Sequence, residues 1–131
     1  QYRAGLSTVV YRRCRHVITE NARVLSAADA LERSDLRAFG KLMGESHQSL
    51  RDDYEVSSEE LDLMVKLAQE VEGVYGARMT GGGFGGCTVN LVAEEHAPQF
   101  QQTVASEYER ITNLKPEIYV CTAANGAEEI T

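Results

Sequence analysis

The residues with the clearest chemical potential form a glycine-rich stretch at positions 81–86. Five of the chain's 11 glycines fall in these six positions, and Phe84 is the sixth residue. Glycine adopts positive φ without a steric penalty but loses the most backbone freedom on folding, so an ordered run of glycines is costly. Bare backbone N–H groups that point the same way form an anion-binding concavity. The stretch therefore predicts a phosphate-binding loop; the simpler alternative is a tight turn between two strands.

The loop fails three known glycine patterns. Gly81, Gly83 and Gly86 have the spacing of the dinucleotide fingerprint, but the residues that follow alternate like a strand instead of opening a helix. Gly81 and Gly86 also have the P-loop spacing, but Cys87 stands where that loop needs lysine. A protein-kinase glycine loop needs valine where Thr88 stands. A phosphate loop here is thus expected to join two strands and to belong to another class.

Five further polar residues are candidates for lining a cleft: Arg78, His47, Arg51, Asp52 and Asp53. A phosphoryl acceptor needs a carboxylate to orient its hydroxyl, which makes the two aspartates candidates. They follow a predicted helix end, where negative charge is unfavourable, so an ion pair with Arg51 or a capping role is the alternative. The simpler interpretation of His47 is a hydrogen-bonded, partly buried side chain. Arg78 is either a phosphate contact or an exposed strand-end arginine.

Composition and charge limit the class of protein. The chain has 131 residues, enough for one domain, and is 43% hydrophobic and 25% charged, as is usual for globular proteins. Its net charge of −7 argues against a nucleic-acid or anionic-membrane surface, because both reward a basic face. The basic residues 12–16 are expected on the solvated side of a helix. No apolar run is long enough to span a bilayer, and no signal peptide is evident.

Three separated cysteines do not form a disulfide framework, and a reducing cytoplasm fits them. Cys87 and Cys121 fall on predicted strands and are expected to be buried as small hydrophobic residues. No cysteine–histidine cluster predicts a metal site. The chain begins at Gln1 without an initiator methionine, which suggests a piece of a longer protein.

Apolar periodicity and capping residues predict helices over residues 8–33, 35–50, 58–72 and 98–112, and strands over 74–80, 88–93 and 117–122. Ser57 and Glu60 have the spacing of a capping box for the third helix. The apolar residues of the first helix are expected to lie roughly on one stripe: Val10, Cys14, Val17, Ala22, Leu25, Ala28 and Leu31. The order of elements predicts an α+β fold, with a small, mainly antiparallel sheet and helices packed on one face.

Two segments carry a resemblance to a known family. Residues 78–87, RMTGGGFGGC, resemble the third motif of the GHMP kinases, a glycine loop between two strands of their C-terminal domain. Residues 45–57, ESHQSLRDDYEVS, are similar to the segment upstream of that motif in galactokinases, and residues 34–36 and 119–121 also match. The resemblance covers nearly the whole chain and is greatest to bacterial galactokinases. It implies that residues 1–131 form a single, ferredoxin-like C-terminal domain of a longer chain.

The resemblance also implies an activity: Mg²⁺-dependent transfer of the γ-phosphoryl group of ATP to D-galactose in the cytoplasm. The residues it assigns to the ATP phosphate loop are Thr80, Gly81, Gly82, Gly83, Phe84, Gly85 and Gly86. It implies that the catalytic residues and Mg²⁺ ligands lie in the missing N-terminal half, so the fragment alone is expected to be inactive. A bulky side chain at Gly83 or Gly85 is expected to abolish activity while leaving the domain folded. Two alternatives stay open: another GHMP kinase, such as an N-acetylgalactosamine kinase, or a non-catalytic, regulatory galactokinase-like protein.

Overall fold

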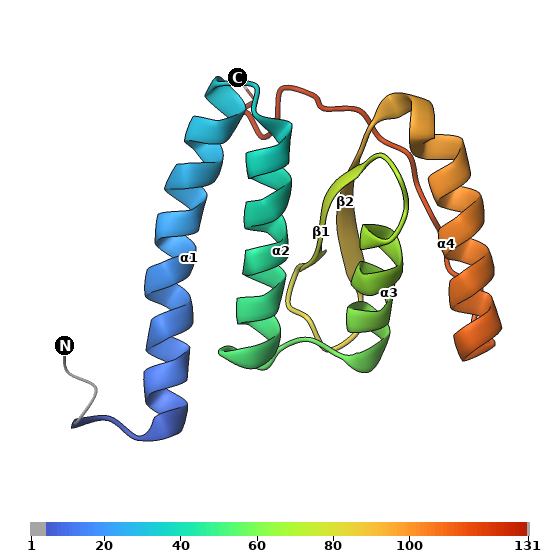
Figure 1. Cartoon of the computed structure of the whole chain (residues 1–131). Coiled ribbons are helices and arrows are strands. Elements are labelled where there is room, and N and C mark those ends of the chain that lie inside the picture. Colours follow the sequence, from blue (N-terminus) through green and yellow to red (C-terminus); the bar gives the residue numbers. More distant parts are fainter. Residues whose placement is uncertain (1–4, 131) are drawn as a thin grey trace.

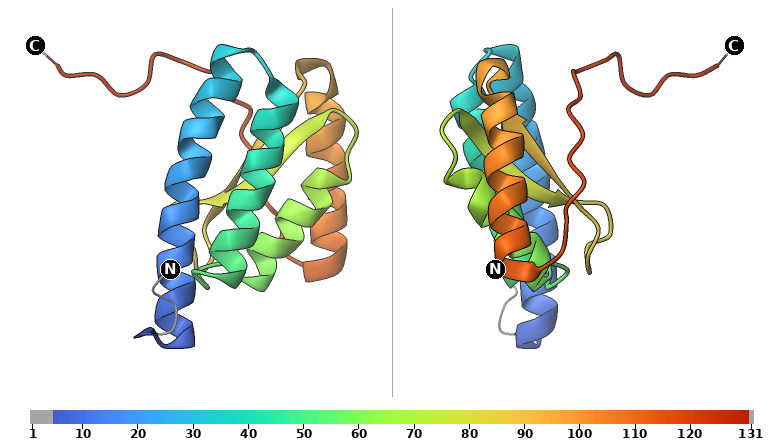
Figure 2. Two further views of the ribbon diagram at one scale, coloured as in Figure 1. Left: turned by 60° about the vertical axis from the view of Figure 1, so that its left-hand side comes forward. Right: turned by 90° about the vertical axis from the view of Figure 1, so that its right-hand side faces the viewer.

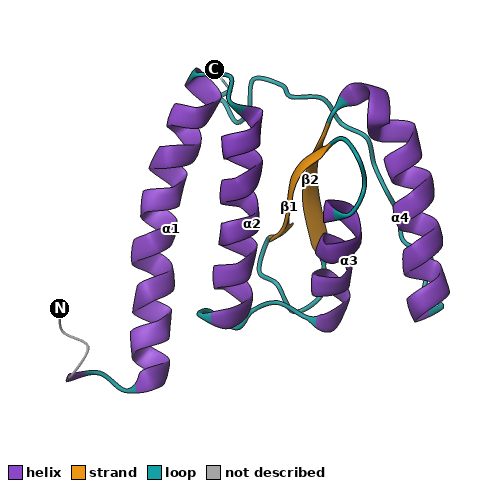
Figure 3. Cartoon of the chain, viewed as in Figure 1, coloured by secondary structure: helices purple, strands orange, loops and turns teal. Residues whose placement is uncertain are grey.

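The computed structural model describes residues 5–130. In this part of the chain, four α-helices accompany one β-hairpin, and Figures 1 and 3 show how the helices lie beside it. In chain order the elements are α1 (Thr8–Glu32), α2 (Leu36–Asp52), α3 (Glu59–Gln69), β1 (Val74–Thr80), β2 (Cys87–Val92), the 3₁₀ turn η2 (Glu94–His96) and α4 (Ala97–Thr112). The predicted α+β fold is confirmed, and each predicted helix is present with ends shifted by at most a few residues.

The sheet has two antiparallel strands among the described residues, β1 and β2, instead of the three predicted. The predicted strand 117–122 is wrong, because residues 114–130 belong to no helix or strand. Its alternation required Ile118 and Val120 to share a buried face. Ile118 packs against the core, but Val120 is 62% exposed, so a single side chain anchors this segment. The end of the chain then extends away from the helices (Figure 2).

The hydrophobic core lies between α3, α4 and the hairpin. Its main cluster comprises Val65, Ala68, Val71, Ala77, Phe100 and Val104. A second cluster of Leu50, Leu61 and Met79 lies toward the end of the hairpin that carries the glycine loop, where Val56 packs against it. Helices α3 and α4 supply most of these residues, because their apolar side chains recur at helical spacing and meet the hairpin.

Side-chain caps begin three of the helices. Ser7 accepts a hydrogen bond from the Val10 N–H, and Asp35 accepts one from the Ala38 N–H. The start of α3 differs from the prediction. Ser58 is the cap, accepting from the Leu61 N–H, while the Ser57 hydroxyl donates to Asp62.

Helix α2 crosses β1 at a contact between two backbones. A Cβ on Gly40 would lie 1.9 Å from the Tyr75 carbonyl oxygen, and a Cβ on Gly76 would lie 2.4 Å from the Gly40 oxygen. The register of the hairpin shifts between Val74 and Gly76, so an irregularity in β1 lies at the same place. Only glycine fits at such a crossing. A close neighbouring backbone thus explains glycine at position 40, whereas a Cβ on Gly44 would meet only the Gln69 side chain, at 3.4 Å.

The apolar stripe predicted on α1 is largely exposed. Val10, Val17, Leu25 and Leu31 are between 45% and 74% exposed, and Ala30 is the one buried apolar residue of this helix. Polar residues of another face of α1 pack against α2 instead, as the contacts described below show. Periodicity identified an apolar stripe on α1, but a stripe cannot show which neighbour covers it.

Candidate functional site

The glycine loop joins β1 to β2 through residues with left-handed backbone. Gly81, Gly83, Gly85 and Gly86 have φ of +77°, +82°, +94° and +128°, which favours glycine at each position. Phe84 also has positive φ, +58°, which is rare for a bulky residue, and its side chain is 77% exposed. An exposed aromatic residue held in this conformation gains nothing from burial here, and such strain gathers at functional sites.

The loop is attached to the segment between α2 and α3 at one point. The Phe84 N–H donates to the Val56 carbonyl oxygen at 2.7 Å. A Cβ on Gly83 would lie 2.0 Å from that same oxygen. Gly83 is therefore required by packing within this domain. This contact argues against the expectation that a bulky residue at Gly83 leaves the domain folded, because the added side chain would meet the backbone of Val56.

The other loop glycines face open space. No atom lies within 4 Å of a Cβ built on Gly81, Gly82, Gly85 or Gly86. Positive φ accounts for three of these four, but Gly82 has neither positive φ nor a close neighbour. Nothing within the described residues requires glycine at position 82. The backbone N–H groups of Gly81, Gly82 and Gly85 also have no acceptor among residues 5–130, so they are free for an external anion.

His47 supports the strand that enters the loop. It is 4% exposed, and its Nδ1 accepts a hydrogen bond from the Met79 N–H at 3.0 Å. Its Nε2 therefore carries the proton in the neutral ring and donates to Asp62 Oδ1 at 2.8 Å. Ser57 donates to the same carboxylate oxygen at 2.7 Å. His47 thus joins α2, α3 and β1 beneath the loop, and its ring nitrogens are both occupied.

The two aspartates at the end of α2 have different surroundings. Asp52 is exposed and accepts two hydrogen bonds from Arg51, at 2.8 and 3.0 Å, and the bonded guanidinium holds the pKa of Asp52 below its ordinary value. Asp53 is 8% exposed and lies 3.5 Å from both Ser49 Oγ and the Arg15 guanidinium. Arg78 is half-buried on β1 and donates to the Met79 carbonyl oxygen. Arg51 and Asp52 thus pair with each other, whereas Asp53 and Arg78 have other partners.

The basic residues near the start of α1 contact the end of α2 instead of lying in solvent. Arg12 and Arg13 donate to the carbonyl oxygens of Asp52 and Asp53, at 3.2 and 2.7 Å, and both pair with Glu55. Guanidinium groups at a helix C-terminus satisfy its last carbonyls and oppose the negative end of its dipole. The prediction of a solvated basic face is wrong for this reason.

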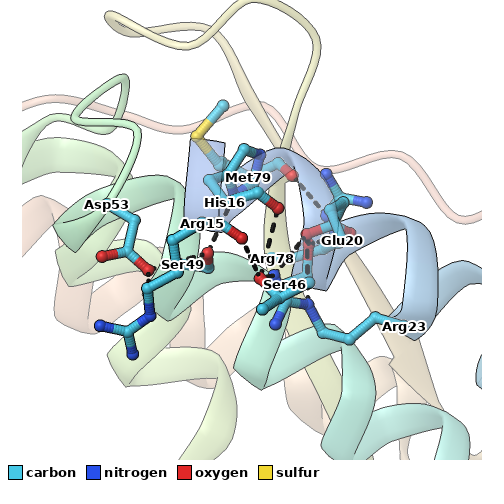
Figure 4. Close-up of polar contacts among 10 residues, drawn as sticks. Arg15, His16, Glu20, Arg23, Ser46, Ser49, Asp53, Arg78 and Met79 are labelled. Carbon is cyan, nitrogen blue, oxygen red and sulfur yellow. Dashed lines mark hydrogen bonds and ion pairs between the residues drawn. The ribbon is translucent and has the colours of Figure 1, made fainter. Parts of the chain in front are cut away.

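Further along, a cluster of polar side chains joins α1 to α2 (Figure 4). His16 is 6% exposed, and its Nδ1 lies 2.9 Å from Ser49 Oγ. Glu20 accepts from Ser46 at 2.8 Å and pairs with Arg23. Burial lowers the pKa of His16, with the positive charge of Arg23 adding to the effect and Glu20 opposing it. The sequence contains a signal for this cluster, because the polar residues 16, 20 and 23 recur at helical spacing on one face of α1. A search for apolar periodicity does not detect polar residues.

Other predicted features also differ from the structure. Cys87 and Cys121 are exposed and unpaired, as is Cys14, so the expectation that the first two are buried is wrong.

Within residues 5–130, no group of three histidine, cysteine, aspartate or glutamate side chains is placed to hold a metal ion. None of the helices in that part of the chain is long and apolar enough to cross a membrane.

Comparison with known proteins identifies the family. The model of the family described as "GHMP kinases C terminal" matches residues 27–110. The galactokinase of Lactococcus lactis, solved in complex with galactose, superposes with a TM-score of 0.80 at 42% identity, over 83% of this chain and 28% of that one. The mevalonate kinase of L. major, solved in complex with R-mevalonate, superposes with a TM-score of 0.56 at 28% identity, over 70% of this chain and 26% of that one. The chain thus spans less than a third of either protein. It belongs to the GHMP kinase family, as a C-terminal domain whose glycine loop joins two antiparallel strands.

Proposed function

We propose that residues 1–131 are one domain, the C-terminal part of a galactokinase that transfers the γ-phosphoryl group of ATP to the 1-hydroxyl of D-galactose. The observation that carries the proposal is the 42% identity and TM-score of 0.80 to a galactokinase that holds galactose. The likeness to mevalonate kinase is lower by both measures. The segment 45–57, which resembles galactokinases, also contains the residues that support the loop, His47 and Val56.

We assign the glycine loop, residues 80–86, to the phosphate groups of ATP or to bracing a second phosphate loop in the upstream part of the protein. The free N–H groups of Gly81, Gly82 and Gly85 support this assignment, as does the open space around them. A glycine without a partner in its own domain, as at Gly82, is explained if a ligand or another domain approaches it closely. Exposed Arg51 and Asp52 remain candidates for lining the cleft, whereas buried His47 and Asp53 act by positioning their neighbours.

We propose that the Mg²⁺ ligands lie outside this chain, as the family resemblance implies; within residues 5–130 no group of three candidate ligands is present. Mg²⁺ prefers several carboxylate and phosphate oxygens in octahedral geometry. We therefore place the metal ligands and the catalytic base in the upstream part of the polypeptide. The three exposed, unpaired cysteines fit a reducing compartment, and we propose a cytoplasmic location.

Product formation by the full-length protein tests the proposal. With ATP and Mg²⁺ we expect D-galactose to yield galactose 1-phosphate faster than N-acetylgalactosamine or mevalonate yields its phosphate. The 131-residue chain alone is expected to give no turnover, because the groups that stabilise the transferring phosphoryl lie elsewhere. Faster turnover of N-acetylgalactosamine would make the protein that kinase instead. Tight binding of galactose and ATP without turnover would indicate a regulatory protein.

A further inference from the structure

Glu55 lies in an unfavourable backbone conformation just beyond the end of α2. Its φ is +58°, in the left-handed region that helix ends usually fill with glycine or asparagine. At the end of α4 the residue with the same φ is indeed an asparagine, Asn113. A non-glycine residue keeps such a conformation only where the surrounding structure holds it there. The contacts of the Glu55 side chain therefore need an explanation.

Two arginines of α1 hold the Glu55 carboxylate. Arg12 pairs with one carboxylate oxygen, and Arg13 pairs with the other at 3.4 Å. Each arginine also donates to a backbone carbonyl at the end of α2, that of Asp52 or Asp53. An isolated exposed ion pair contributes little, but charges joined in a network with fixed geometry contribute more. The backbone at Glu55 is thus fixed from α1.

The next residue, Val56, carries the glycine loop. Its N–H donates to the Leu50 carbonyl oxygen at 3.1 Å, and its side chain packs on the second hydrophobic cluster. Its own carbonyl oxygen accepts the 2.7 Å hydrogen bond from the Phe84 N–H. Phe84 also has φ of +58°, so a strained residue lies on each side of this bond. Figure 1 shows the loop after β1 beside the segment that joins α2 to α3.

We infer that Glu55 is a positioning residue for the glycine loop. Its pairing with the two arginines fixes its φ, and a change of this angle would turn Val56 and its carbonyl group. The loop would move with that carbonyl, because the Phe84 N–H is bonded to it. The N–H groups of Gly82 and Gly85, in the same loop, would then lose their alignment. The effect on ATP rests on the proposed function, whereas the positioning of the loop does not.

Hydrogen exchange at the Phe84 amide tests the positioning in the full-length protein without nucleotide. Glu55→Gln removes the negative charge and keeps the size of the side chain. Glu107→Gln is the matched control, because Glu107 pairs with Arg110 at 2.7 Å on α4 and its side chain is 42% exposed, against 44% for Glu55. We expect Phe84 to exchange about tenfold faster in Glu55→Gln, since its hydrogen bond would open more often. The control should exchange at the native rate.

Glu55→Asn separates the pairing from the backbone strain. Asparagine adopts positive φ more readily than glutamate but carries no charge. If the arginine pairs position the loop, Phe84 should exchange faster in this variant too. Exchange at the native rate or slower in Glu55→Asn would show that the backbone alone sets the loop, and would overturn the inference.

Steady-state kinetics separate positioning from a loss of folded protein. We expect Glu55→Gln to raise KM for ATP by about tenfold, because misaligned donors hold the phosphates less well, and to leave KM for D-galactose unchanged. A smaller folded fraction would instead lower the apparent kcat and leave both KM values as they are.

The possible results divide cleanly. Native exchange at Phe84 in Glu55→Gln would overturn the inference, as would faster exchange in an active galactokinase whose KM for ATP stays the same. Faster exchange with a raised KM for ATP supports it. Faster exchange in a protein that phosphorylates no galactose would keep Glu55 as the positioning residue of the loop and remove the proposed function.

Discussion

Two groups of glycines in this domain have opposite surroundings. At the crossing of α2 and β1, Gly40 and Gly76 bring two backbones so close that neither position has room for a Cβ. In the loop between β1 and β2, Gly81, Gly82 and Gly85 face empty space. The fold thus explains glycine at the crossing. In the loop, glycine is explained only by a positive φ or by a group outside the domain that approaches it closely. Gly83 lies in the loop, but it resembles the crossing glycines in having no room for a Cβ, because the Val56 carbonyl oxygen lies against it.

The largest loss of stability is expected at the crossing. Replacing Gly40 by alanine would force the Cβ into the Tyr75 carbonyl group and separate α2 from β1. Overpacking of this kind against backbone should cost about 3 kcal/mol or more. Urea unfolding of the full-length protein measures the change, with Gly44→Ala as the control because its Cβ would meet only the end of a side chain. Equal stabilities for the two variants would show that the backbones can separate without cost.

The second-largest loss of stability, about 2–3 kcal/mol, is expected for Gly83→Ala. The alanine would have to adopt a left-handed φ, and its Cβ would contact the Val56 carbonyl oxygen. Gly85→Ala has similar φ but no neighbour within 4 Å, so it should lose only the conformational part, about 1–2 kcal/mol. Thermal midpoints of the two variants, measured side by side, test the difference. A midpoint for Gly85→Ala as low as that for Gly83→Ala would mean that the Val56 contact adds nothing.

Gly82→Ala should change stability by less than about 0.5 kcal/mol, since surface changes without strain or clash have small effects. If the loop approaches phosphate closely, the same methyl group should lower kcat/KM for ATP by about a hundredfold, because a small misplacement of reacting groups is costly. Steady-state kinetics and thermal midpoint on one preparation give both values. Normal kinetics would show that nothing approaches Gly82, and the loop would be only a strand connection.

The smallest effect is expected on the other side of α2, at His16. Burial lowers the pKa of His16 from 6.5, so the unfolded chain binds a proton more readily than the folded one. Stability should therefore be fully present above pH 6.5 and decrease as the pH falls below that value toward the lowered pKa. His16→Gln should reduce this dependence, as seen in urea midpoints between pH 5 and 8. His96, which is less buried, provides a control variant. An unchanged pH dependence in His16→Gln would assign it to other groups.

The sequence by itself determined the helices, the hairpin and the position of the glycine loop, because periodicity, caps and glycine clusters are local signals. It also identified the apolar stripe of α1 and the residues around the loop. Only the tertiary structure decided what each of these contacts. The stripe of α1 faces outward because polar residues of its other face pair with α2, and Gly83 differs from Gly82 because one carbonyl group, that of Val56, lies against it. Such distinctions depend on neighbours distant in the chain, and residue type and spacing do not carry that information.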